Sequence, residues 1–236
     1  MTDPSTRDVS DVKHTVTAAA SSSSSSRAKQ FLETCKCPSS ATAYGSYEEL
    51  VKDKNVDIIY VATPHSHHFQ NAMLCLLNGK HVLCEKAFTV NAAQAKKLIE
   101  TAKEKGLFLM EAVWTRFFPL SIQIRKMVED GELGAVHRVI ADLSFGQDVE
   151  NTWGADGAKH RMVNMDLAGG ALLDRTSPLR SSIYHNQYND LALMNHPSSR
   201  HLSSHLVFPN NLPHCPEGPA QSPHHHLLHR KILFWR

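Results

Sequence analysis

Apolar residues alternate along the first half of the chain between short continuous runs and stretches with helical spacing. Residues 57–63 (DIIYVAT) form a continuous apolar run rich in β-branched side chains, which is typical of a strand covered on both faces. Residues 66–78 repeat apolar positions at helical spacing and stop at Gly79, a residue common just after a helix. Residues 81–84 (HVLC) then predict a second strand.

The same alternation continues on both sides of this segment. Asn91 is the predicted N-cap of a helix that reaches Lys105 and ends at Gly106, and residues 107–110 predict another strand. Upstream, the pattern predicts a strand over 14–20, a helix over 27–35 and a helical turn over 47–51. Strands that alternate with helices over short connections predict a doubly wound parallel sheet, because such crossovers are right-handed.

The composition changes near Asp174. Residues 175–236 hold more than half of the 16 His, most of the 11 Pro and no sustained period. We therefore predict three parts: a partial dinucleotide-binding domain over 1–113, the start of a substrate and dimerisation domain over 114–174, and a low-order His/Pro-rich tail over 175–236. In the second part, apolar residues around 122–128 predict a helix, and residues 136–145 predict the first strand of a second sheet.

Composition also excludes several classes of protein. A chain with 42% hydrophobic and 20% charged residues has enough apolar side chain to bury a core. The longest apolar runs are far shorter than the roughly 20 residues that cross a bilayer, and the polar N-terminus lacks the pattern of a secretory signal. Five sparse Cys favour reduced thiols and a cytoplasmic location. No Lys-rich block with interleaved aromatics indicates a nucleic-acid partner, and we expect no membrane partner.

Ligands of doubly wound sheets bind beyond the carboxyl ends of the strands. Three segments should meet there: the serine run that starts at Ser21, residues 63–68, and residues 85–87. The pattern predicts the crevice without identifying its ligand.

Residues 61–120, which run from VATPHSHH through GKHVLCEKAF to MEAVWTRFFPL, are more specific. They resemble the glucose–fructose oxidoreductase, inositol dehydrogenase and MocA family of NAD(P)-dependent dehydrogenases. Within it they look most like the branch of dimeric dihydrodiol dehydrogenases and NADP-dependent D-xylose dehydrogenases. The resemblance spans about residues 13–174. It implies a Rossmann-like sheet, NADP rather than NAD, a small sugar or diol substrate, and a homodimeric parent whose dimer surface is largely missing here.

The resemblance assigns three residues to catalysis. Lys86 matches the family's catalytic Lys, whose cation orients the substrate hydroxyl and lowers the pKa of a neighbouring acid–base group. His68 aligns with the family's His after the Thr-Pro turn, which hydrogen-bonds the substrate or the nicotinamide ribose. Asp174 closes the match to Gly-Gly-Ala-Leu-Leu-Asp. Ala87 stands where the family has Pro, which weakens the stiffness of the turn that holds Lys86.

The family's acid–base Tyr, four residues after the Asp, has no counterpart, because Pro178 occupies that position. Tyr184 and Tyr188 are the nearest tyrosines and lack the right spacing. Loss of an acid–base group typically removes two to four orders of magnitude in rate. We therefore expect the chain with this sequence to be a poor catalyst.

Further residues are assigned to cofactor binding. Ser21, Ser22 and Arg27 follow the first predicted strand, where an acidic residue would select NAD; hydroxyls and a cation instead suit the extra phosphate of NADP. A polar low-complexity linker is the alternative interpretation. The remaining cofactor candidates are Thr63, Pro64, His65, Glu85, Lys86, Trp114 and Arg116. Trp114 and the aromatics after it are expected to form a core between the two domains.

The family pattern is missing at both ends: the glycine-rich turn before the first strand is absent, and the match stops after Asp174. No GxGxxG precedes the first predicted strand, since the first glycine is Gly45, so the expected fold is α/β with an incomplete doubly wound parallel sheet that lacks its first β–α unit. After it we expect the start of an α+β domain and an irregular tail. One hypothesis for residues 175–236 is unrelated sequence appended by a reading-frame change or a retained intron.

Three functions stay open. The first is an NADP-dependent dehydrogenase that acts on a sugar or diol, with oxidation of D-xylose to its lactone as the leading reaction. The second is a catalytically impaired fragment or non-enzymatic nucleotide-binding module. The third is a His-rich metal-binding protein, suggested by His224, His225 and His226. The three His of residues 65–68 have no carboxylate or Cys at metal spacing nearby, so no metal site is assigned there.

Overall fold

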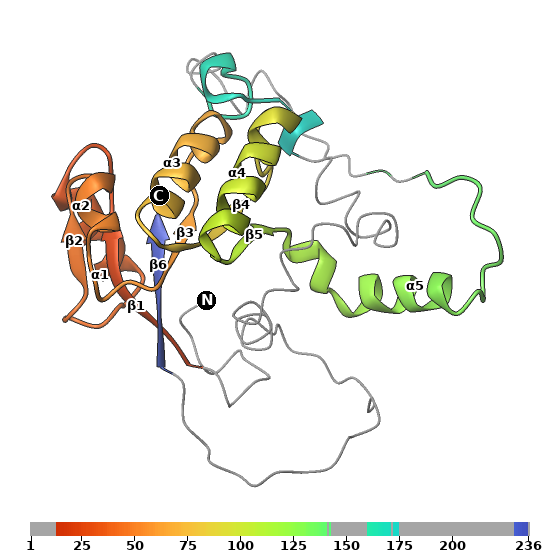
Figure 1. Cartoon of the computed structure of the whole chain (residues 1–236), viewed down its shortest axis with the longest axis horizontal. Coiled ribbons are helices and arrows are strands. Elements are labelled where there is room, and N and C mark those ends of the chain that lie inside the picture. The colour runs from red at the N-terminus through yellow and green to blue at the C-terminus, as the bar shows by residue number, and fades with distance from the viewer. Residues whose placement is uncertain (1–12, 141, 143–159, 171, 175–228, 236) are drawn as a thin grey trace, which may run out of the picture.

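One six-stranded parallel sheet organises the computed structural model, which describes residues 13–140, 142, 160–170, 172–174 and 229–235 (Figure 1). The strand order is β2-β1-β6-β3-β4-β5, and every described pairing is parallel. Helices lie on both faces, which confirms the expected α/β Rossmann-like fold.

The elements follow one another along the chain with short connections. The strands are β1 (Lys13–Ala20), β2 (Thr42–Tyr44), β3 (Ile58–Val61), β4 (His81–Glu85), β5 (Leu109–Ala112) and β6 (His229–Trp235). The α-helices are α1 (Ser25–Thr34), α2 (Tyr47–Val51), α3 (His65–Leu77), α4 (Ala92–Lys105) and α5 (Pro119–Glu129), and the short 3₁₀ helices are η2 (Trp114–Phe117) and η4 (Met165–Leu167). β2 is the strand that the periodicity did not indicate.

Local signals explain where the helices begin and end. The Asn91 side chain accepts a hydrogen bond from the backbone N–H of Gln94 and caps α4, and Gly106 ends that helix in the left-handed conformation (φ 64°). Both were expected from the sequence. Ser24 caps α1 in the same way, through the N–H of Arg27, so the serine run supplies a helix start.

The main core lies between the sheet and three helices. α2, α3 and α4 cover one face, where Leu50, Leu76 and Leu98 are fully buried against strand residues such as Ile59 and Val82. α1 covers β1 on the opposite face, through a smaller cluster made by Val16, Ala19, Ala28 and Leu32. Every residue of β3 is buried, as a strand covered on both faces requires.

The structure differs from the expectation at the end of the chain. Residues 229–235, which we placed in an irregular tail, form β6 between β1 and β3 in the middle of the sheet. The position that lacked a strand in the sequence is therefore occupied. The other predicted tail residues, 175–228 and 236, lie outside the described residues.

The segment after β5 also departs from the prediction. α5 matches the helix expected around 122–128, and Figure 1 shows it extending away from the sheet. Residues 136–140 and 142 form no strand, and the remainder of the expected strand lies outside the described residues. Trp114 and Phe118 contact each other edge to face but are 54% and 44% exposed, so they do not form the expected interdomain core.

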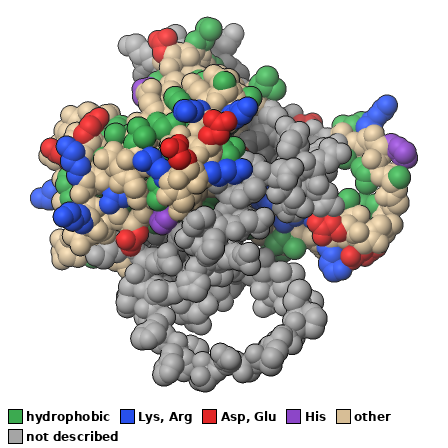
Figure 2. Space-filling model, in the orientation of Figure 1, with side chains coloured by type: hydrophobic (Ala, Val, Ile, Leu, Met, Phe, Trp, Pro, Cys, Tyr) green, Lys and Arg blue, Asp and Glu red, His purple; other side chains and the backbone are tan. Residues whose placement is uncertain are grey.

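The described surface carries charges of both signs. Figure 2 shows Lys and Arg interspersed with Asp and Glu over this face, without a large patch of one sign. Within the described ranges, no helix has the length and apolar character needed to cross a membrane.

Candidate functional site

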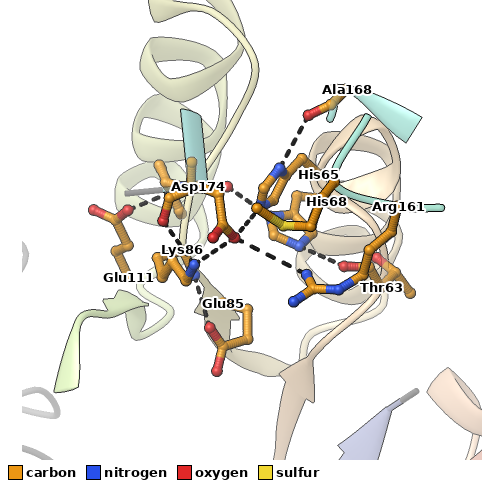
Figure 3. Close-up of polar contacts among 12 residues, drawn as sticks. Thr63, His65, His68, Glu85, Lys86, Glu111, Arg161, Ala168 and Asp174 are labelled. Atoms are coloured by element: carbon orange, nitrogen blue, oxygen red, sulfur yellow. Dashed lines mark hydrogen bonds and ion pairs between the residues drawn. The ribbon is translucent and has the colours of Figure 1, made fainter. Parts of the chain in front are cut away.

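A hollow of about 330 Å³ lies at the carboxyl ends of β3 and β4. It is lined by Ala62, Thr63, Pro64, His65, Glu85, Lys86, Trp114, Arg161 and Leu167. Two of the segments expected to converge, after β3 and after β4, do meet here. Arg161 and Leu167 line the hollow on the side of α3, and Figure 3 shows Asp174 and Arg161 pointing into the same group of side chains as Lys86 and His65.

Lys86 and Asp174 form the central contact of this hollow. The Lys86 Nζ atom donates to the Asp174 carboxylate at 2.6 Å and to its backbone carbonyl at 2.7 Å. Both side chains are largely buried, with exposures of 17% and 13%. The lysine that ends the EK run therefore points into the crevice rather than into bulk water, and its partner comes from 88 residues further along the chain.

Two more basic groups face the same carboxylate. His65 Nε2 lies 3.8 Å and Arg161 Nη1 lies 4.0 Å from Asp174 Oδ1. Burial by itself would raise the pKa of Asp174, but the hydrogen bond and charge of Lys86, together with the Arg161 guanidinium, outweigh it and hold the pKa below its ordinary value. Asp174 is therefore a carboxylate at neutral pH, suited to hold a cation and poorly suited to accept a proton.

His65 is oriented for a proton-accepting role. Its Nδ1 faces the Ala168 carbonyl oxygen at 3.1 Å, and a carbonyl only accepts hydrogen bonds, so Nδ1 must carry the proton. In the neutral ring, Nε2 is then an acceptor, on the side that faces Asp174.

Gly169 packs closely against the backbone of residues 161–164. A Cβ atom at this position would lie 2.6 Å from the Arg161 carbonyl oxygen and 2.9 Å from that of Asn164, closer than real Cβ contacts come. Only glycine permits this close approach of the backbone to residues 161–164, in the segment that carries Arg161 and leads to Asp174. The first glycine of the matched Gly-Gly motif thus has a packing reason, whereas Gly170 has a positive φ of 122°.

The structure corrects the role expected for His68. This side chain is fully buried, and its Nδ1 and Nε2 atoms face the carbonyl oxygens of Ala87 at 2.7 Å and Thr63 at 2.8 Å. No ring nitrogen is left to contact a substrate or a ribose. His68 instead ties α3 to the turns that follow β3 and β4, so it positions the catalytic candidates.

Other contacts hold the turn that carries Lys86, whose peptide bond to Ala87 is cis. Glu111 on β5 accepts a hydrogen bond from the Phe88 N–H at 3.0 Å, and Glu85 accepts one from the Lys86 N–H at 3.1 Å. The Tyr60 hydroxyl donates to the other oxygen of Glu85. Burial and this hydrogen bond raise the pKa of Tyr60 well above its ordinary value. Tyr60 is thus a fixed donor rather than an exchangeable acid.

A second hollow of about 410 Å³ lies beside the carboxyl end of β1. Its lining includes Ser21, Arg27, Gln30 and Thr34 with the apolar surface of Phe31. Ser21 is 4% exposed, and its hydroxyl contacts that of Ser23 at 3.0 Å. Two of the three residues assigned to the NADP phosphate thus line one hollow; Ser22 is exposed outside it.

The sequence-predicted residues fall into three groups. Thr63, Pro64, His65, Glu85, Lys86, Trp114 and Asp174 line or contact the hollow at β3 and β4. Ser21 and Arg27 line the other one, while His68, Ser22 and Arg116 lie in neither. Arg161 and Glu111 were missed, because neither has a local sequence signal and both reach the site through tertiary contacts. Tyr184, Tyr188 and Pro178 lie outside the described residues.

The part of the chain that the structure describes contains no cluster of three or more His, Cys, Asp or Glu placed to hold a metal ion. The three histidines of α3 diverge instead: His65 faces Ala168, His67 contacts Ser66 at 2.9 Å, and His68 is buried.

Comparison with known proteins gives consistent matches. Residues 3–113 match the model of the oxidoreductase family described as having an NAD-binding Rossmann fold. The chain is 63% identical over 172 residues to a D-xylose 1-dehydrogenase (NADP(+)) from Hypocrea jecorina, covering 72% of this chain and 44% of that enzyme. It is 44% identical over 149 residues to the human trans-1,2-dihydrobenzene-1,2-diol dehydrogenase, covering 63% of this chain and 41% of that enzyme. The chain thus spans less than half the length of these relatives.

A solved structure agrees with the fold. A variant of KijD10, a 3-ketoreductase from Actinomadura kijaniata in complex with TDP-benzene and NADP, is 31% identical, with a TM-score of 0.51. The match covers 67% of this chain and 45% of that protein.

Proposed function

Because the chain belongs, through residues 3–113, to the oxidoreductase family with an NAD-binding Rossmann fold, we propose that it acts as an NADP-dependent dehydrogenase on a sugar or diol. The Lys86–Asp174 pair at the carboxyl edge of the sheet is the observation that supports this activity most directly. D-xylose is the proposed substrate and its lactone the product, on the strength of the 63% identity to the Hypocrea jecorina enzyme.

The donor set beside β1 fits the extra phosphate of NADP. Ser21 supplies a hydroxyl, and Arg27 adds a guanidinium that can form paired hydrogen bonds with phosphate oxygens. Within this hollow's lining no Asp or Glu is present to accept the ribose hydroxyl of NAD or to repel a phosphate. The nicotinamide end would lie in the hollow at β3 and β4, lined by Thr63, Glu85 and Trp114.

The side chains around Lys86 suit oxidation of a carbinol. Bound NADP⁺ supplies the hydride acceptor, and the products are the carbonyl compound, NADPH and a proton. Lys86 would exchange part of its contact with Asp174 for the substrate hydroxyl and stabilise the charge that develops on that oxygen. Asp174 holds the ammonium in place. His65 Nε2 is the proposed acceptor for the hydroxyl proton, and the resulting imidazolium would be stabilised by Asp174.

The test is a paired measurement of binding and turnover on the full chain. Titration with NADPH, followed by fluorescence, measures cofactor binding; formation of NADPH from NADP⁺ with D-xylose or a trans-dihydrodiol measures turnover. Lys86→Met should keep NADPH binding and lose about 10²- to 10⁴-fold in rate. Lys96→Met, at an exposed position of α4, is the matched control and should change neither. Equal rates for wild type and Lys86→Met would contradict the proposal.

A nucleotide-binding module without turnover is the second candidate. Pro178 at the position of the family's acid–base Tyr favours it. NADPH binding in the absence of any detectable product from sugars or diols would select this alternative.

A further inference from the structure

The sheet consists of two groups of strands that only β6 joins within the described residues. β1 pairs with β2 on one side, and β3 pairs with β4, which pairs with β5, on the other. β1 and β3 do not pair with each other; each pairs with β6. Figure 1 shows this strand, at the blue end of the chain, lying between β1 and β3, which both come from the first third of the chain.

β6 pairs along both of its edges. Ile232–Trp235 lie opposite Ile58–Val61 of β3, and residues 229–232 lie opposite residues 13–16 of β1, with an irregularity before Ala19. Both ladders are parallel. A strand between two neighbours satisfies backbone donors and acceptors on each, so its removal would leave two unpaired edges in the middle of a sheet.

The position of β6 in the sequence sets it apart from the other strands. The other five strands lie within residues 13–112, in an order that short crossovers produce, whereas residues 175–228 stand between Asp174 and β6. A strand that joins a sheet through parallel backbone ladders and comes from a remote segment of the chain resembles a peptide added to a sheet. We propose that the space between β1 and β3 is a strand-acceptor site and that residues 229–235 of this chain bind it as a separable β-strand.

The inserted strand lies between the two halves of the proposed cofactor site. Trp235 is opposite Ala20 on β1 and Val61 on β3. The residues that directly follow these two strands line separate hollows: Ser21 lines the hollow beside β1, and Ala62 lines the hollow at β3 and β4. The presence of a strand in the acceptor site therefore fixes the position of one hollow relative to the other. This consequence for NADPH rests on the proposed function, whereas the strand insertion itself does not.

Hydrogen exchange on the intact protein gives the first test. The backbone amides of Ile232, Leu233 and Phe234 should exchange as slowly as those of Ile59 and Tyr60, because they belong to the same ladder. Exchange of these three amides at the rate of an unstructured peptide, while β3 stays protected, would overturn the proposal. This measurement needs no variant and no ligand.

Deletion and addition in trans give the second test. A chain that lacks residues 229–236 should lose at least tenfold protection at alternate amides of β1 and β3, while the β4–β5 ladder keeps its protection. The peptide HRKILFWR should restore the protection in a saturable manner, and the same peptide with Ile232→Pro should not, because proline removes a ladder N–H. Unchanged protection after deletion, or equal rescue by both peptides, would overturn the proposal.

Two further outcomes are informative. If the shortened chain aggregates, it is refolded in the presence of each peptide and the yield of soluble protein is measured. Only the unmodified peptide should yield soluble protein. Failure of both peptides to yield soluble protein would count against the acceptor site. A dimer with protected residues 229–235 supports the acceptor site, with the strand supplied by a second copy. NADPH affinity should fall at least tenfold on deletion and recover with the peptide. Restored exchange protection without NADPH binding would contradict the proposed function alone.

Discussion

The Lys86 ammonium and the Asp174 carboxylate lie 2.6 Å apart, although 88 residues separate them in the chain. This pair fastens residues 160–174 to the carboxyl edge of the sheet and aligns the two groups on which the proposed chemistry depends. It is also the contact whose energetics can be measured without any substrate.

The Asp174→Asn variant should lose about 1.5–3 kcal/mol of unfolding free energy at neutral pH, the usual contribution of a hydrogen bond to a charged group. Because the pKa of Asp174 is lower in the folded than in the unfolded state, its contribution is present above the unfolded pKa and is lost as pH falls through the folded pKa. Wild type and variant should therefore converge in stability under acidic conditions. Urea unfolding across this pH range measures the difference; a gap that persists at low pH would contradict the assignment.

His68 should make the stability depend on pH in a range above the one in which Asp174 acts. Burial lowers its pKa in the folded state, although hydrogen bonds to the Ala87 and Thr63 carbonyls act in the opposite direction. The unfolded state then binds more protons, so stability should fall as pH drops through about 6.5, the ordinary His value. His68→Gln should remove this dependence, because Gln does not titrate, and should cost about 1–3 kcal/mol, because a flexible amide does not reproduce the ring's contacts with both buried carbonyls.

His67 provides a matched control for that measurement. It is the neighbour of His68, is half-buried and contacts only Ser66 among the hydrogen bonds described for its ring. His67→Gln should leave the pH dependence of stability in place. If His67→Gln removes it and His68→Gln does not, the buried ring is not its source.

Arg27 should discriminate between the two cofactors. Arg27→Ala should weaken NADPH binding about tenfold or more and change NADH binding little, since a bidentate contact to phosphate is lost. Lys29→Ala, two residues further along α1 and exposed outside the hollow, controls for the loss of one positive charge. Competition titrations with both dinucleotides measure the ratio, and equal losses from both cofactors would count against this site.

Gly169→Ala should loosen residues 160–174 without unfolding the sheet. The new Cβ would meet the Arg161 carbonyl at 2.6 Å, so the turn must open and the Lys86–Asp174 contact should weaken. Gly45→Ala is the control, because its Cβ would come no closer than 3.5 Å to any atom. Faster proteolysis within residues 160–174 of the Gly169 variant alone, at unchanged circular dichroism, is the expected result.

Much of the fold could be predicted because its signals are short-range. The β-branched run at 58–61, the Asn91 cap and the Gly106 stop each depend on neighbours within a few residues. Helical spacing likewise indicated which face of α3 and α4 is buried. The strand expected over 136–145 was inferred from the same kind of pattern, yet residues 136–140 form none. Strand formation depends on pairing and packing that a local pattern does not encode.

In the candidate site, too, some residues could be predicted from local motifs and their contacts could not. Lys86 and Asp174 were identified from matched motifs, but the sequence could not show that His68 is enclosed by two carbonyls or that Arg161 approaches the carboxylate. Those relationships depend on how separate segments pack, and no local pattern encodes them.

By itself, then, the sequence determined the parallel α/β order of residues 13–112 and the residue types at the ends of its strands, because helix periods, caps and strand composition act over one or two turns of chain. The tertiary structure decided which of those residues meet and that residues 229–235 occupy the middle of the sheet. Backbone ladders accept any strand of suitable geometry, so the choice among distant segments is made only by the free energy of the assembled fold.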